Sequence, residues 1–245
     1  MSSTPDLARP HASRSNSAAP RGRRFVAWPL WATLAGAAGA IGTVGTDLRP
    51  AAETAAWQEG RDYIVTSADM AGLDPALGRI GYSVGLLAIL ALIVFAAAWR
   101  RHVEQRFAGS IGARVVSVGL VASAGALVLG YGWRGALANY LGPEAGLYDS
   151  EGLFVYYMLT DFGAYLPWTG VLVSAFGLAW MAWAERSVSR ILGGFTTIAA
   201  AGALLLVLIS GVPGLPGVFM PAWLAVTGIW LAVGRSRVAE REDAR

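Results

Sequence analysis

The chain has 245 residues, of which 55% are hydrophobic and only 14% are charged, with a formal net charge of +3. A soluble domain carries about 25% charged residues, so this composition excludes an ordinary water-soluble fold and indicates a membrane protein. The absence of cysteine excludes a disulfide framework, a thiolate zinc site and a cysteine nucleophile. All 19 basic residues are Arg, which together with abundant Ala and Gly is typical of a GC-rich bacterial genome.

The chain begins with a polar segment, residues 1–24, that contains Ser, Pro, Arg and His and almost nothing apolar. We expect a disordered tail, because such a segment cannot bury enough surface to order itself. Arg21, Arg23 and Arg24 directly precede the first apolar run, which favours a cytoplasmic location under the positive-inside rule. A cleaved export signal is the alternative, but the apolar run is longer than the 7 to 15 residues expected of a signal core.

The first predicted transmembrane span covers residues 25–46 and carries a regular glycine pattern. Gly36, Gly39, Gly42 and Gly45 recur every third residue with alanines between them. Such a surface has almost no side chains and lets another helix approach closely, which is how helices associate in lipid. The pattern favours a packing face inside the bundle, and a homodimer face is the alternative.

Further apolar segments predict five more spans, at residues 75–99, 111–133, 163–185, 191–210 and 218–233. Between the first two spans lies the longest connection, residues 47–79. We expect a short surface helix after Pro50 and a helix start at Asp74-Pro75, with Trp57 and Tyr63 at the level of the lipid headgroups. Residues 134–150 read as a polar connection. The predicted fold is thus an all-α bundle of six transmembrane helices over residues 25–237, with a short tail at 238–245.

Charged residues are distributed unevenly between the two sides of these spans. The segments 1–24, 100–114, 185–190 and 235–245 hold 15 arginines and 6 acids, whereas the remainder holds 4 arginines and 10 acids. The positive-inside rule therefore places both termini in the cytoplasm. We expect a multi-pass protein of the bacterial plasma (inner) membrane, with the lipid bilayer as its solvent.

The stretch 150–185 contains Asp161, the only acid well inside an apolar segment, and Pro167 six residues later. Two interpretations are open. The segment 167–185 is long enough to cross the hydrocarbon alone, which would leave residues 151–166 in the outer interface and Asp161 in contact with water. Alternatively the whole stretch is one tilted helix kinked near Pro167, and Asp161 enters the bundle, where an acid by default marks a pathway or a polar partner.

Tyr157, Asp161 and Tyr165 fall at positions i, i+4 and i+8, so they share one helix face and could hydrogen-bond one another or a ligand. This face is the candidate polar pathway or ligand site. The candidate packing face is the one formed by Gly36, Gly39, Gly42 and Gly45.

Several functions find no support in the sequence. Residues 81–85 match the G-x-S-x-G pattern of serine hydrolases, but Ser83 lies near the start of a membrane helix and His102 is about 28 Å further along it. With His11 in the tail as the only other histidine, we expect no haem, zinc or other cofactor and no catalytic residue. No phosphate-binding glycine motif follows a strand, and the basic tail is too short to indicate nucleic-acid binding.

The six spans, the long first outer loop and a C-terminal pattern together resemble the small six-helix bacterial integral membrane proteins of unknown function. That pattern is Pro221-Ala222-Trp223-Leu224 followed by Gly228-Ile229-Trp230-Leu231 and arginine. The resemblance implies a fold and no chemistry. The sequence favours a non-catalytic membrane component that packs with itself, as a homo-oligomer, or with a membrane partner protein. The alternative is a small transporter or channel for a polar solute or proton that uses Asp161, and an intramembrane enzyme comes third.

Overall fold

The computed structural model describes residues 25–234 and residue 238, and this part of the chain is all-α, as predicted. Its α-helices are α1 (Leu30–Ala40), α2 (Ala51–Gln58), α3 (Pro75–Trp99), α4 (Ile111–Tyr140), α5 (Ser150–Gly163), α6 (Thr169–Trp183), α7 (Arg190–Ser210) and α8 (Leu215–Val233). Two π-helical segments, η1 (Ile41–Gly45) and η3 (Arg100–Glu104), continue α1 and α3. Two 3₁₀ segments are η2 (Ser67–Gly72) and η4 (Leu166–Trp168). The predicted tails fall outside the described residues, apart from Val238.

Five helical stretches are long and apolar enough to cross a membrane. They are Pro75–Glu104, Ile111–Tyr140, Ser150–Trp183, Arg190–Ser210 and Leu215–Val233. The first predicted span is shorter than expected, since its apolar helix covers only Leu30–Gly45. It begins after Pro29 because a proline disfavours helical conformation in the residue before it.

Local sequence signals set the helix ends. Asp74 caps α3 by accepting the Ala76 amide at 2.8 Å, with Pro75 in the first helical position, so the predicted start is confirmed. The short helix predicted after Pro50 is also confirmed as α2. Ser110, Asp149 and Ser189 begin α4, α5 and α7 in the same way as Asp74. At its other end α7 stops at Gly211, whose φ of +72° is a left-handed conformation that glycine adopts without strain.

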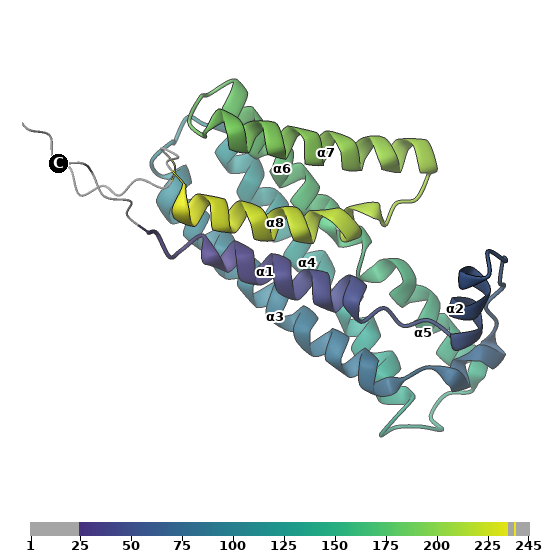
Figure 1. Cartoon of the computed structure of the whole chain (residues 1–245). Helices are drawn as coiled ribbons and strands as arrows, with labels where there is room; N and C mark the ends of the chain where they lie inside the picture. Colours follow the sequence, from purple (N-terminus) through teal and green to yellow (C-terminus); the bar gives the residue numbers. More distant parts are fainter. Residues whose placement is uncertain (1–24, 235–237, 239–245) are drawn as a thin grey trace, which may run out of the picture.

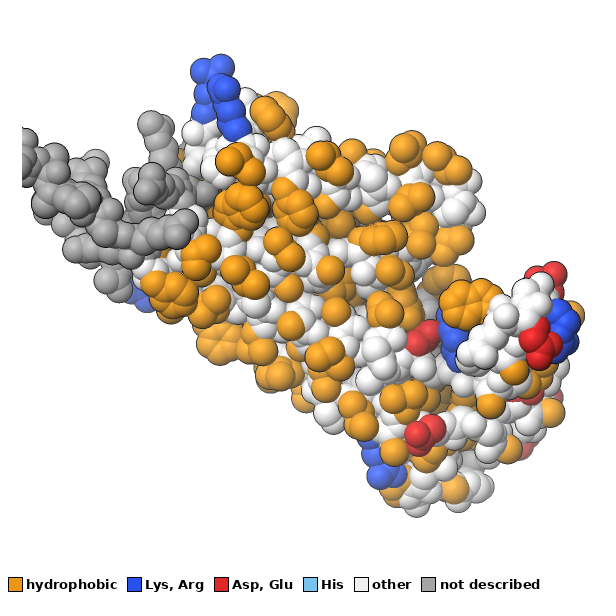
Figure 2. Space-filling model, in the orientation of Figure 1, with side chains coloured by type: hydrophobic (Ala, Val, Ile, Leu, Met, Phe, Trp, Pro, Cys, Tyr) orange, Lys and Arg blue, Asp and Glu red, His pale blue; other side chains and the backbone are white. Residues whose placement is uncertain are grey.

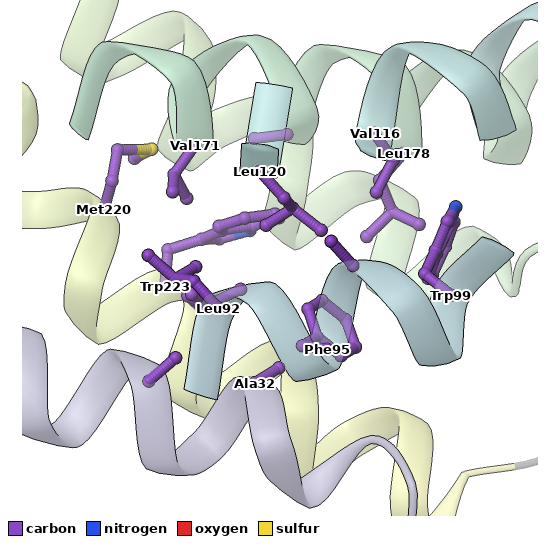
Figure 3. Close-up of a cluster of buried hydrophobic side chains, with 14 of the residues drawn as sticks. Ala32, Leu92, Phe95, Trp99, Val116, Leu120, Val171, Leu178, Met220 and Trp223 are labelled. Atoms are coloured by element: carbon purple, nitrogen blue, oxygen red, sulfur yellow. The ribbon is translucent and has the colours of Figure 1, made fainter. Parts of the chain in front are cut away.

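The helices pack side by side around α4, which contacts α3 on one side and α5 and α6 on another (Figure 1). Helix α1 lies between α3 and α8, and α7 covers α6 and α8. Figure 3 shows the core, where aromatic and aliphatic side chains from α1, α3, α4, α6 and α8 interdigitate. Phe95, Trp99 and Trp223 are its large aromatic members. A void lined mainly by apolar side chains, with Ser174 and Thr227 at its edge, holds about 10 Å³.

A belt of close helix approaches divides the molecule into two parts. Gly42 of η1 contacts the backbone of Gly85 in α3, Gly130 of α4 contacts Gly163 at the end of α5, and Gly217 of α8 contacts Tyr165. We call this level the waist. From the waist to the end that carries Val26 and Ala232, α4 has 20 residues, Ile111–Gly130, which is about 30 Å of helix and matches a hydrocarbon core.

Beyond the waist the structure forms what we call the cap. It consists of α2, η2, α5 and the ends of α3 and α4, residues 75–84 and 131–140, and in Figure 1 it projects past the ends of α7 and α8. A small second core holds it together, with Met70, Leu137 and Tyr157 among its buried members. Figure 2 shows that acidic side chains on the visible face gather in this region, while the bundle to its left is covered by hydrophobic side chains.

One expectation about a boundary is wrong. Helix α4 continues to Tyr140, so residues 134–140, predicted as a polar connection, are helical. The reason is that Arg134 finds buried polar partners and does not need water. The predicted fourth span, 163–185, starts where the chain breaks between α5 and α6, at Ala164 and Tyr165 before Pro167. The stretch around Asp161 is therefore two helices joined by a 3₁₀ turn, and α5 belongs to the cap.

Candidate polar site at the waist

Arg134 is the centre of a polar cluster that joins the cap to the bundle. Its side chain is only 1% exposed, although it is charged. The guanidinium donates to the carbonyl oxygen of Gly42, and at 3.3 Å to both the carbonyl and the hydroxyl oxygen of Thr46. It also lies 3.7 Å from the carboxylate of Asp47. Arg134 thus caps the end of the first apolar helix, where free carbonyls carry partial negative charge.

The π-helical geometry of η1 explains why acceptors are available there. A π-helix pairs residues five apart, so carbonyls at its junction with an α-helix lose their usual partners. The hydroxyl of Thr46 is a second donor to these carbonyls. It donates to the carbonyl oxygens of Ile41 and Gly42 at 3.1 and 3.0 Å. Gly81 of α3 has no side chain, which leaves room for the side chain of Arg134. A Cβ atom added at Gly81 would lie about 3.0 Å from the nearest atom of Arg134.

A chain of ion pairs leads from Arg134 across the cap. Asp47 accepts from Arg49 at 2.7 Å, Arg49 donates to Glu53 at 2.7 Å, and Glu53 accepts from the Tyr157 hydroxyl at 3.2 Å. Burial by itself lowers the pKa of Arg49, but Asp47 and Glu53, with a smaller contribution from Asp161, shift that pKa above its usual value. Arg49 therefore stays charged, and the chain fastens the first long loop to α4 and α5.

The three residues of the predicted polar face have different surroundings. Tyr157 is buried, with 7% exposure, and bonds Glu53. Tyr165 is half-buried and lies against Gly217 of α8. Asp161 is exposed, and within the described part of the chain it forms no hydrogen bond or ion pair. Tyr157 thus contacts the first loop through Glu53, and among the described residues no hydrogen bond joins the three side chains to one another.

A second hydrogen-bonded group lies on the bundle side of Arg134. The hydroxyls of Thr43 and Tyr131 are 2.7 Å apart, the Trp168 indole donates to Thr43 at 3.2 Å, and Thr43 donates to the carbonyl of Ala164 at 3.4 Å. All three side chains are buried. This group joins η1 and α4 to the turn between α5 and α6. The break between α5 and α6 is therefore held in place by contacts with both η1 and α4.

The four glycines of the predicted packing face point at different neighbours. An added Cβ on Gly36 would meet the backbone of Pro221 and Ala225 in α8, and one on Gly39 would meet the Trp168 ring. Gly42 contacts α3, whereas Gly45 meets only atoms of its own helix. Three of the four glycines thus face other helical segments of this chain. They do not form one packing face, because each of the three faces a different segment.

Sequence reasoning missed Arg134, Thr43 and the carboxylates of the first loop. The available signal was the spacing of Tyr131 and Arg134, three residues apart at the end of an apolar run, which puts two polar groups on one helix face. Thr43 and Thr46 repeat this spacing at the end of the first apolar helix. Among the described residues, no group of three His, Cys, Asp or Glu side chains is close enough to hold a metal ion.

The fold and composition fit a membrane protein of several apolar helices. No protein-family model matches this chain, and no curated protein or solved structure is significantly similar to it.

Proposed function

We propose that the protein is a non-catalytic component of the bacterial inner membrane that associates with itself or with a partner protein. One observation carries this proposal. The polar groups at the waist, from Arg134 through Asp47, Arg49 and Glu53 to Tyr157, are linked by ion pairs and hydrogen bonds and so form a clamp that fixes the cap. A rigid platform on a membrane bundle suits a docking or scaffolding role, because its shape is set before a partner binds.

The proposal includes six transmembrane helices and cytoplasmic termini. The apolar helix Leu30–Gly45 is short, yet it packs between α3 and α8 and reaches the waist through Gly42. The arginine-rich segments 100–114 and 185–190 lie at the opposite end of the bundle from the acid-rich cap, in agreement with the positive-inside rule. The cap then faces the outside of the plasma membrane.

Quantitative cross-linking in native membranes tests this function. The chain has no cysteine, so single cysteines placed on the cap and on α7 report contacts with neighbours without background. A stoichiometric adduct, to a second copy or to one partner, is the expected result. Purification of a monomer with no adduct at either surface contradicts the proposal.

A second function is favoured by the free carboxylate of Asp161. An exposed acid beside Arg49, at the level where the bundle meets the cap, is suited to a small transporter or channel for a proton or a polar solute. Proton and solute flux into liposomes tests this alternative. Flux that Asp161→Asn abolishes and Glu144→Gln leaves unchanged would establish transport and displace the non-catalytic function.

A further inference from the structure

We propose that the exposed face of α5 is a docking site for a basic amphipathic helix of a partner protein, with Asp161 pairing with one of its cations. This inference rests on the proposed function, because it names the surface and the chemistry of the partner. The apolar side chains on this face are Val155, Met158, Leu159 and Phe162, which follow the i, i+3, i+4, i+7 spacing of one helical stripe. We call them the α5 stripe.

The stripe is well exposed although it belongs to a folded helix. Val155 is 56% and Met158 59% exposed, whereas the opposite face of α5 is buried through Tyr157 and Thr160. The helix itself is held rigidly, since Asp149 caps it, Glu151 accepts from Ser67 at 2.8 Å, and Tyr157 bonds Glu53. An ordered helix that presents an apolar stripe is the usual partner of an amphipathic helix.

Lipid does not cover the whole stripe. Tyr165 lies at the waist against Gly217 in the first turns of α8, so the hydrocarbon ends near this level. Val155 is eight residues before Gly163, the last residue of α5, which is about 12 Å by helical rise, whereas the headgroup layer on one side is only about 5–8 Å thick. The outer half of the stripe therefore extends beyond the lipid, where an exposed apolar surface marks an interaction site.

The charge of the cap selects the kind of partner. The segments 47–79 and 134–161 contain ten acids and four arginines, and Arg49, Arg61 and Arg134 are already paired with acids of this chain. A second copy would bring one acid-rich surface against another, which is unfavourable. A helix with Arg or Lys beside an apolar face complements both the stripe and Asp161.

The surface is hollowed beside the cap. Figure 2 shows an indentation between the end of α7 and the cap, bordered by hydrophobic side chains and, on the cap side, by acidic and arginine side chains. Phe162 at the lower end of the stripe contacts Gly214 in the turn before α8, so the stripe runs outward from the edge of the bundle. A docked helix would lie along α5 with its base against this turn.

A model peptide tests the site with the full-length protein in phosphatidylcholine nanodiscs. The probe is a synthetic helix with Leu on one face and Arg on the other, and the matched control peptide carries Glu in place of Arg. A cysteine at Met158 reports protection from a water-soluble thiol reagent, with empty nanodiscs as the baseline. We expect labelling of the free protein and protection by the basic peptide only.

The charge variant distinguishes specific docking from general attraction. Asp161→Asn should weaken binding of the basic peptide about three- to tenfold, as expected for a partly exposed ion pair, and Glu144→Gln should leave it unchanged. Equal losses in the two variants, or no protection at position 158, would overturn the inference. It is also overturned if position 158 resists the reagent without peptide, which means lipid coverage, or if it cross-links to a second copy. A partner cross-linked only through α7 would refute this site and leave the proposed function standing.

Discussion

Arg134 of α4 and Asp47, in the loop after the first apolar helix, lie 3.7 Å apart, although one is almost fully buried and the other reaches solvent. The pair joins the inner polar group around Thr43 to the ion pairs of the cap. Because Arg134 also donates to the backbone of Gly42 and Thr46, it compensates the end of a helix that the sequence leaves short.

Replacing Arg134 tests whether it fixes the cap. Arg134→Met should destabilise the folded protein by about 3 kcal/mol, because it removes the buried hydrogen bonds to the carbonyls of Gly42 and Thr46 together with the ion pair to Asp47. Arg134→Lys keeps the charge but not the forked geometry of the guanidinium, so it should lose less stability than Arg134→Met. Unfolding in mixed micelles measures the difference. Exposed Arg79→Met is the control, and equal losses at the two arginines would contradict this role.

The waist predicts a sharp difference between glycines of one helix. Gly130→Ala should destabilise the protein by about 3 kcal/mol or more, because the new Cβ would overlap the backbone of Gly163. Gly125→Ala meets open space and should be neutral or slightly stabilising, since alanine favours helix. Thermal unfolding followed by circular dichroism compares the two. A neutral Gly130→Ala would mean that α4 and α5 do not touch.

Thr43→Val tests the inner hydrogen-bonded group at nearly constant volume. The substitution leaves the buried Tyr131 hydroxyl and Trp168 indole without their acceptor, so we expect a loss of about 3 kcal/mol. Thr169→Val, on the exposed side of α6, should cost less than about 0.5 kcal/mol. Adding Tyr131→Phe to Thr43→Val should cost less than the sum of the two, and strict additivity would show that the residues are independent.

The segment 62–72, which includes η2, should respond to acid. Asp69 accepts from the Thr66 amide at 2.8 Å and from the Tyr63 hydroxyl at 2.7 Å, which lowers the pKa of Asp69. A lowered pKa in the folded state means that the contribution to stability is present above the unfolded pKa of about 4 and is lost as pH falls through the folded value.

Hydrogen exchange of residues 62–72 measures this effect at pH 6 and pH 3, after correction for intrinsic rates. Exchange should increase at pH 3, and Asp69→Asn should exchange fast at both pH values. Asp62→Asn, at an exposed position, is the control. In this variant the exchange of residues 62–72 should still increase at pH 3. An unchanged response in Asp69→Asn would assign the effect to another group.

Cysteine labelling checks the topology. Single cysteines at Gly60 and Gly146, both in the cap, should react in intact cells with a membrane-impermeant reagent, and a cysteine at Arg101 should react only after lysis. Each site is exposed, so a failure to react reports its location. Reaction at Arg101 in intact cells would reverse the orientation and place the cap in the cytoplasm.

The membrane class, the all-α fold and the starts of α2, α3, α4 and α7 follow from the sequence alone. Hydropathy over about 20 residues is a local property, and so is the Asp74-Pro75 cap. Five of the apolar segments accordingly correspond to long apolar helices. The extension of α4 past Trp133 could not be seen locally, because an arginine after an apolar run normally marks the membrane edge.

The tertiary structure decided the roles of individual polar residues. Asp161 was the outstanding residue of the sequence, yet in the fold it is the exposed one, while Arg134 is buried and bonded. Sequence spacing reports which residues share a helix face, but not which distant loop packs against that face. Asp47, Glu53 and Thr43 reach their partners only when α1, α4 and α5 meet at the waist, since burial and pairing of a charge depend on neighbours far away in the chain.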